Sequence, residues 1–301
     1  MRLAAVGDNI TDCYLDAGLM YPGGNCVNVA VHAARAGARA SYVGSAGRDE
    51  RGDRLAAALR EEGVDLSRLR RPAGPTGYAT VVNVGGERVF GPYDRGVARF
   101  RLDEADVEFV AAHDVAHSSY SADLEEQLPA LAGRVPLSFD FDSHTGDDYA
   151  AALVPYVTYA FFSASHLGAA ETGDLLRWAV GRGAHVALAT RGAAGAWLFD
   201  GRELLAEPAV PVEVVDTLGA GDTFIAHVLT GLAAGLDGRE TLRRASTHAA
   251  RVCTALGAFG HAAPLTPDVG ELRDLPQFRD VADPPRLPES PEGSRAAPTP
   301  Q

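Results

Sequence analysis

The sequence contains no lysine, so every one of its 27 basic residues is an arginine. This absence excludes a P-loop with its Walker A lysine, a protein-kinase fold with its strand lysine, and Schiff-base chemistry on a lysine. If a chain of this kind transfers phosphoryl groups, it must use backbone N–H groups, arginine and metal ions.

Cysteine is scarce as well. Cys13, Cys26 and Cys253 are widely spaced and form no C-x-x-C pair, which excludes a recognisable disulfide framework or zinc cluster. No apolar run reaches the ~20 residues of a membrane span. The first residues, 1–8, have too little hydrophobic length for a signal peptide. We therefore expect a cytoplasmic protein without a membrane partner.

Basic residues are fewer than acidic ones: the sequence has 27 arginines and 40 aspartates and glutamates, and its net charge is −13. A chain with this balance is not expected to bind nucleic acid. Its 301 residues and hydrophobic content of 46% are sufficient for one large α/β domain with a small accessory element, or for two ordinary domains.

The most informative segment is D-T-L-G-A-G-D at residues 216–222. A β-type run at 210–215 precedes it, and apolar residues follow with helical spacing from Phe224 to Ala233. A glycine loop at the start of a helix offers unpaired backbone N–H groups to an anion and allows close approach. A carboxylate there would repel a bound phosphate, but it suits a base beside a phosphoryl group in transit. The segment therefore predicts a kinase.

Residues 216–224, D-T-L-G-A-G-D-T-F, resemble the C-terminal signature of the ribokinase-like (PfkB) carbohydrate kinases. Residues 23–30, G-G-N-C-V-N-V-A, resemble the sugar-binding glycine motif of the same family and stand in the family's order. A closer similarity is to fructoselysine 6-kinases, through Gly7-Asp8-Asn9, Met20-Tyr21-Pro22 and residues 88–97. The resemblance covers about residues 3–265.

This resemblance implies an ATP-dependent kinase that phosphorylates a primary hydroxyl of a ketose-type sugar. Fructoselysine or a related fructosamine, converted to its 6-phosphate, is the leading substrate. Two alternatives stay open. One is a kinase for another small acceptor, such as ribose, fructose, 2-keto-3-deoxygluconate or a nucleoside, and the other is a non-catalytic sugar or nucleotide sensor.

Alternating strand and helix patterns predict an α/β fold with a mainly parallel central sheet covered by helices on both faces. We expect strands at 3–7, 40–44, 115–118, 137–140, 159–163 and 186–190, and helices at 25–36, 53–62, 123–132, 147–154, 171–182, 221–235 and 239–256.

Two stretches, 12–21 and 77–100, lack a helix between their strands, and the second contains a Gly85-Gly86 hairpin turn. They are expected to form a small β-sheet, which the resemblance implies is a lid over the sugar. An exposed apolar sheet face favours a homodimer through the lid. The kinase domain is expected to span 1–282, and the proline-rich tail 283–301 to be disordered or, alternatively, a docking peptide.

Asp222 is the expected catalytic base, which would accept the proton of the attacking hydroxyl. Backbone N–H groups of Gly219, Ala220 and Gly221 would stabilise the transferring phosphoryl group. The alternative for Asp222 is an ordinary helix N-cap. For Asp216 the resemblance implies a monovalent cation site for potassium (K+), and a structural role in the turn is the alternative.

Asp8 follows the first predicted strand, where open α/β sheets present ligand-binding groups, and its carboxylate can accept two sugar hydroxyls. Asn25 and Asn28 offer donor and acceptor groups to the same sugar. The alternative for Asn25 is a helix N-cap, and for Asn28 an amide on the helix surface.

Gly23 and Gly24 are expected to let the sugar approach the backbone. The lid residues Phe90, Tyr93 and Arg95 are expected to contact the far end of the substrate.

Thr190, Arg191, Gly192 and Gly195 follow a predicted strand and resemble the nucleotide loop of the family. Gly257 lies in a segment that borders the adenine in relatives. These residues are the expected ATP-binding elements.

Many family members carry Asn-x-x-Glu where this sequence has Ser163-Ala164-Ser165-His166. Either Glu171 organises water around Mg2+ instead, or magnesium is held mainly by the nucleotide and solvent. His166 is a poor candidate ligand because magnesium prefers oxygen.

Overall fold

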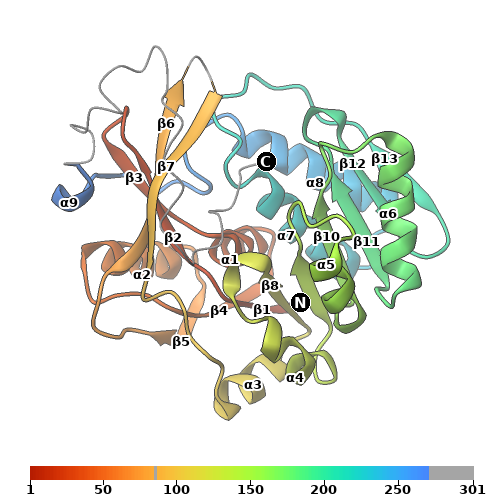
Figure 1. The fold of residues 1–301 in the computed structure, drawn as a ribbon, viewed down its shortest axis with the longest axis horizontal. Helices are drawn as coiled ribbons and strands as arrows, with labels where there is room; N and C mark the ends of the chain where they lie inside the picture. Colours follow the sequence, from red (N-terminus) through yellow and green to blue (C-terminus); the bar gives the residue numbers. More distant parts are fainter. Residues whose placement is uncertain (85–86, 271–301) are drawn as a thin grey trace.

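The computed structural model describes residues 1–84 and 87–270, with the backbone alone for residues 82–84 and 87–90. The larger of its two sheets is built from nine strands: β1 (Arg2–Val6), β4 (Arg39–Ser45), β5 (Asp65–Arg70), β8 (Val115–Ser119), β9 (Leu137–Asp140), β10 (Tyr159–Ser163), β11 (Val186–Thr190), β12 (Ala196–Phe199) and β13 (Leu204–Glu207). Their order is β13-β12-β11-β10-β9-β8-β1-β4-β5 (Figure 1).

All neighbours from β11 to β5 pair in parallel, whereas β12 and β13 add antiparallel strands at one edge. Successive side chains of a strand point to opposite faces. Leu3 and Ala5 accordingly pack into one apolar cluster, and Ala4 and Val6 into the other. The first face is covered by α1 (Asn25–Arg35), α2 (Glu50–Glu61), α7 (Ala220–Ala233) and α8 (Gly238–Val252), and the second by α3 (Glu104–Ala111), α4 (Leu128–Ala132), α5 (Asp148–Leu153) and α6 (Ala169–Gly181). The predicted parallel sheet with helices on both faces is confirmed.

The predicted small sheet is confirmed as well. It contains β2 (Ile10–Tyr14), β3 (Leu19–Gly23), β6 (Thr76–Val84), β7 (Glu87–Gly96) and β14 (Ala263–Pro264), in the order β14-β3-β2-β6-β7. In Figure 1 it stands at one side of the molecule, away from α6. The expected turn at Gly85-Gly86 and the expected tail at 283–301 lie outside the described residues. Pairing of two lids in a dimer stays a prediction.

The predicted strand at residues 210–215 is wrong, because this segment has no regular structure. Its valine-rich pattern suggested a strand, but Val214 and Val215 are 58% and 50% exposed. The backbone N–H groups of Val215 and Asp216 donate to the carbonyl of Cys253, just after α8, rather than to a neighbouring strand. The sequence patterns also missed β5, β12, β13 and α3.

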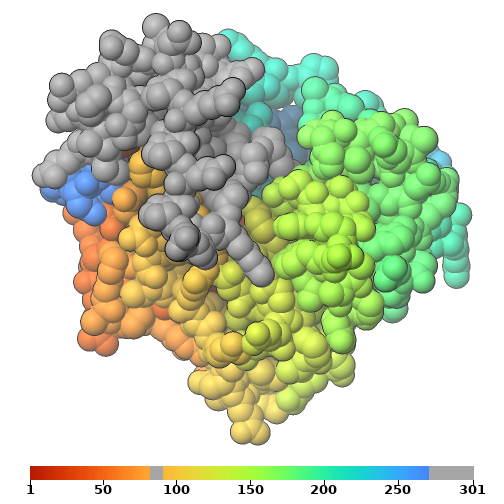
Figure 2. Space-filling view, viewed as in Figure 1, coloured from red at the N-terminus to blue at the C-terminus, as the bar shows by residue number. Residues whose placement is uncertain are grey.

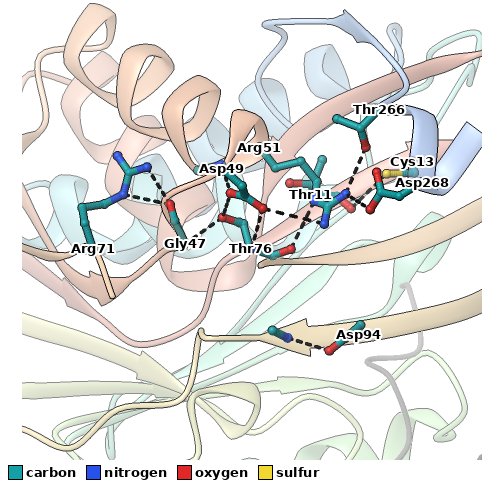
Figure 3. A network of polar contacts seen from close by, with 12 residues as sticks. Thr11, Cys13, Gly47, Asp49, Arg51, Arg71, Thr76, Asp94, Thr266 and Asp268 are labelled. Atoms are coloured by element: carbon teal, nitrogen blue, oxygen red, sulfur yellow. Dashed lines mark hydrogen bonds and ion pairs between the residues drawn. The ribbon is translucent and has the colours of Figure 1, made fainter. Parts of the chain in front are cut away.

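A buried arginine of α2 fixes the small sheet to the rest of the fold (Figure 3). Arg51 of α2 is only 5% exposed and donates to Thr76 O at 3.2 Å, Thr266 Oγ1 at 3.0 Å and Asp268 Oδ2 at 2.8 Å. Asp49, the N-cap of α2, accepts from Thr76 N at 2.8 Å. These contacts join α2, the first residue of β6 and the segment after β14.

Among the described residues, no helix combines the length and apolar character needed to cross a bilayer.

Candidate active site

A cavity lies where the small sheet meets the C-terminal ends of the parallel strands. Its lining includes Asp8 after β1, Asn25 and Asn28 of α1, and Gly221 and Asp222 at the start of α7. In open α/β sheets this is the end at which ligands bind. The glycine motif and the signature loop, which are far apart in the sequence, therefore meet at one cavity.

Asp222 is held by two amides from α1. Asn25 Nδ2 donates to Asp222 Oδ1 at 2.8 Å, and Asn28 Nδ2 donates to Asp222 Oδ2 at 2.6 Å. The N-cap of α7 is Gly219, so the helix-capping alternative for Asp222 is wrong. Asn28 is 3% exposed, so the surface-amide alternative is also wrong.

The surroundings of Asp222 change its acidity. Burial raises its pKa to about 7, and the charge of Asp8 adds to this effect, while the two amides act in the opposite direction. A general base is most effective when its pKa lies near the operating pH. Asp222 therefore has the acidity that proton transfer at neutral pH requires.

The signature loop offers fewer free N–H groups than expected. The Ala220 N–H donates to Thr217 O at 3.2 Å, which makes it part of the turn rather than of an anion site. The Thr223 N–H bonds to Gly219 O. Gly221 and Asp222 stand between Ala220 and Thr223 in the first turn of α7. In this turn a helix leaves its backbone N–H groups without partners inside the helix.

A network behind Asn25 was not predicted from the sequence. Asn25 Nδ2 also donates to Asp140 Oδ2 at 2.8 Å, and Asn25 Oδ1 lies 2.9 Å from His117 Nε2. Burial lowers the pKa of His117 to about 3, so the ring is neutral, and its Nε2–H is assigned as the donor to Asn25. Burial raises the pKa of Asp140 well above its usual range and also raises that of Asp142. The sequence signal for these two buried carboxylates is the run F-D-F-D at residues 139–142, where β9 ends.

Asp8 both lines the cavity and accepts hydrogen bonds from the first N–H groups of α1. Its carboxylate accepts from Asn25 N at 2.8 Å, Cys26 N at 3.3 Å and Ser119 Oγ at 3.1 Å. The helix begins at Asn25, with Gly24 as its N-cap, so the N-cap alternative for Asn25 is wrong. The side chain of Asn25 is free to organise the carboxylates instead.

The two glycines of the motif are required by the protein itself. Gly24 has φ +106°, and a Cβ there would lie 2.6 Å from Asn9 Cα. A Cβ on Gly23 would lie 2.2 Å from Asp12 Oδ2. Of the two, Gly24 lines the cavity and Gly23 does not, whereas Asp12, which was not predicted, does. Gly23 therefore permits close packing of β3 on β2.

The predicted lid residues lie as follows. Tyr93 and Arg95 line the cavity, and Arg95 forms an ion pair with Asp123. The side chain of Phe90 lies outside the described residues.

The predicted nucleotide residues do not line this cavity. Thr190 ends β11, and after Arg191 the chain forms a 3-10 turn at Gly192–Ala194, which ends at Gly195. Arg191 Nη2 donates to Leu167 O at 3.1 Å, and its guanidinium lies 5.4 Å from the centre of the Trp197 ring.

The predicted cation residues have structural partners. Asp216 is 3% exposed and accepts from Tyr14 Oη, from Leu218 N at 3.0 Å and from Gly257 N at 3.1 Å, which supports its role in the turn. Glu171 Oε2 accepts from Gly168 N at 2.8 Å in the capping box of α6 and is not in the cavity. Across residues 1–84 and 87–270, no group of three or more His, Cys, Asp or Glu side chains could hold a metal ion.

Comparison with known proteins agrees with this arrangement. Residues 10–262 match the model of the pfkB family carbohydrate kinases. The chain is 44% identical over 269 residues to the fructosamine kinase FrlD of Bacillus subtilis, covering 88% of this chain and 95% of that protein. It is 35% identical over 261 residues to the fructoselysine 6-kinase of Escherichia coli, covering 85% and 99%. The structure of Arabidopsis thaliana ribokinase with ribose and ATP aligns with a TM-score of 0.75 at 22% identity, covering 86% and 95%, which confirms the ribokinase-like fold.

Proposed function

Because the chain belongs to the pfkB family of carbohydrate kinases, we propose that it transfers a phosphoryl group from ATP to the 6-hydroxyl of a fructosamine such as fructoselysine. The names of the two relatives at 44% and 35% identity support this substrate class. The observation that carries the proposal is the Asp222 carboxylate, held by two amides at the cavity with a pKa of about 7.

The reaction follows from the position of Asp222. The 6-hydroxyl gives its proton to the Asp222 carboxylate as its oxygen attacks the γ-phosphorus of ATP, and ADP leaves. The free amides of Gly221 and Asp222 at the start of α7 stabilise the negative charge of the transferring group. Asn25 and Asn28 keep the carboxylate aimed at one point and oppose a further rise of its pKa.

Two buried acceptors support a polyol substrate. Asn9 and Asn28 border the cavity, are 2% and 3% exposed, and each has an Oδ1 atom without a hydrogen-bond donor in the structure. An unpaired buried acceptor is costly, and sugar hydroxyls supply the missing donors. Asp8 and Asp12 add carboxylates that accept from further hydroxyls.

ATP is proposed to lie along the loop of Thr190, Gly192 and Gly195, beside Gly257. Its magnesium ion neutralises charge on the phosphates. Glu171 is occupied in the cap of α6 and the described residues offer no ligand cluster, so the ion is proposed to arrive with the nucleotide. Potassium at Asp216 competes with three hydrogen bonds already made there.

The proposal is tested by measuring ADP release with magnesium ATP and a panel of acceptors: fructoselysine, fructosylglycine, fructose, ribose, 2-keto-3-deoxygluconate and adenosine. The expected result is the highest kcat/KM for a fructosamine. A higher kcat/KM for any other acceptor would contradict the substrate class. No ADP release with any acceptor, while ATP still binds, would favour a sensor.

A further inference from the structure

Two arginines stand apart from the other charged residues of the cavity. Arg95 of β7 and Arg99, a few residues beyond it, both line the cavity, whereas the remaining charged lining residues in the described part of the chain are aspartates. The Arg95 side chain is 20% exposed and that of Arg99 is 59% exposed. The cavity lining is therefore cationic where Arg95 and Arg99 lie beside Asp123, and aspartates supply its charge elsewhere, including Asp12 of β2 in the small sheet.

Both guanidinium groups bind the same carboxylate oxygen. Arg99 Nε donates to Asp123 Oδ2 at 2.7 Å, and Arg95 Nη1 donates to that oxygen too. Asp123 directly follows the 3-10 turn Tyr120–Ala122, whose residues line the cavity, and it has the uncommon φ of 56°. On the surface, the yellow segment that returns from the lid adjoins the yellow-green segment that contains Asp123 (Figure 2).

One carboxylate does not balance two guanidinium groups. A guanidinium has five N–H donors in a planar fork that suits a carboxylate. Arg95 and Arg99 each use one nitrogen on Asp123, so donors and one net positive charge remain at the cavity edge. A plain latch between lid and domain would need only one of these arginines.

We propose that Arg95 and Arg99, oriented by Asp123, form a subsite for the carboxylate of the amino-acid part of the substrate. This inference rests on the proposed fructosamine kinase function. A fructosamine made from an amino acid carries its carboxylate beyond the nitrogen, at the end opposite the 6-hydroxyl. With that hydroxyl at Asp222, the amino-acid end is proposed to extend toward the edge of the cavity at which Arg95 and Arg99 lie.

The test compares carboxylates with neutral amides of the same shape. Fructosylglycine is paired with fructosylglycinamide, and fructoselysine with its carboxamide, so that two spacer lengths are covered. Each compound is assayed with wild-type enzyme, Arg99→Gln, Arg95→Gln and the control Arg101→Gln. Arg101 is 73% exposed, pairs with Glu126 and does not line the cavity.

The wild type is expected to prefer the carboxylate in at least one pair by about tenfold in kcat/KM, as charge-assisted hydrogen bonds allow. Arg99→Gln should abolish that preference through KM, with a much larger loss on the carboxylate than on the amide, while Arg101→Gln keeps the preference. Arg99 is largely exposed, so this variant should fold normally.

Equal use of carboxylate and amide by the wild type would overturn the subsite while the kinase assignment stands. An Arg99→Gln variant that loses activity equally on both members of a pair would show a structural latch instead. No turnover of any fructosamine, with turnover of another acceptor, would remove the proposed function together with the subsite.

Discussion

Removal of the Asn28 amide should make Asp222 a weaker acid and shift the pH dependence of the enzyme. Asn28 Nδ2 donates to Asp222 Oδ2 at 2.6 Å. Burial raises the pKa of Asp222 and this bond lowers it, and the net pKa is about 7. A hydrogen bond to a charged group contributes about 1.5–3 kcal/mol, which corresponds to roughly one to two pKa units. In Asn28→Ala the pKa should therefore rise to roughly 8–9.

The assay is the pH profile of kcat/KM, which reports the ionisation of the free enzyme. A base must be deprotonated to act, so activity falls with decreasing pH below the pKa. The wild-type profile should bend near pH 7, and the Asn28→Ala profile should bend one to two units higher. Lost contacts to the sugar would lower the whole curve, but they would not move the bend.

Asn9→Ala is the matched control. Asn9 lines the same cavity and has an unpaired Oδ1, but its amide donates to Tyr42 and Ser45 rather than to Asp222. This variant should lower the curve and leave the bend in place. An Asn28→Ala bend that stays near pH 7 would refute the account of how Asp222 is tuned.

Arg51→Gln should lower the free energy of unfolding by about 2–4 kcal/mol, because buried donors of the lid network are lost, whereas the exposed Arg54→Gln should change it by ~0.5 kcal/mol or less. Gly24→Ala should lower the free energy of unfolding by more than about 2 kcal/mol, because of its positive φ and the close backbone contact. Gly133→Ala, with open space around its Cβ, should lower it little. Urea unfolding measures both variants, and equal losses would contradict the argument. Burial raises the pKa of Asp222 above its unfolded value, so its contribution to stability is present at acidic pH and lost as pH rises toward about 7. Asp222→Asn should therefore gain stability relative to wild type from pH 4 to 7, by up to ~4 kcal/mol, and a constant difference would contradict this.

Local patterns were sufficient to predict the frame of the site. The glycine motif at 23–30 and the signature at 216–222 both predict a loop followed by a helix, and parallel strands bring such loops to one end of the sheet. The meeting of Asn25 and Asn28 with Asp222 follows from this frame. Their hydrogen bonds do not, because they depend on how α1 packs against α7.

The unpredicted residues depend on contacts between distant segments. His117 and Asp140 come from neighbouring strands, β8 and β9, and reach Asn25 only because the sheet places α1 above them. The Asp123 pairing requires the segment after β7 of the small sheet to return beside the 3-10 turn Tyr120–Ala122. The failed strand at 210–215 shows the opposite case, since a good local pattern found no neighbouring strand to pair with.

The central claim, that Asp222 is the base of a fructosamine 6-kinase, is tested most directly by product analysis of wild type and Asp222→Ala. Each protein is incubated with magnesium ATP and fructoselysine, and the product is identified by phosphorus and carbon NMR. The wild type should form the 6-phosphate. Asp222→Ala should bind ATP normally but react at least ~10²-fold more slowly, as expected for loss of a general base. A phosphate at another position, or an unimpaired Asp222→Ala variant, would contradict the account.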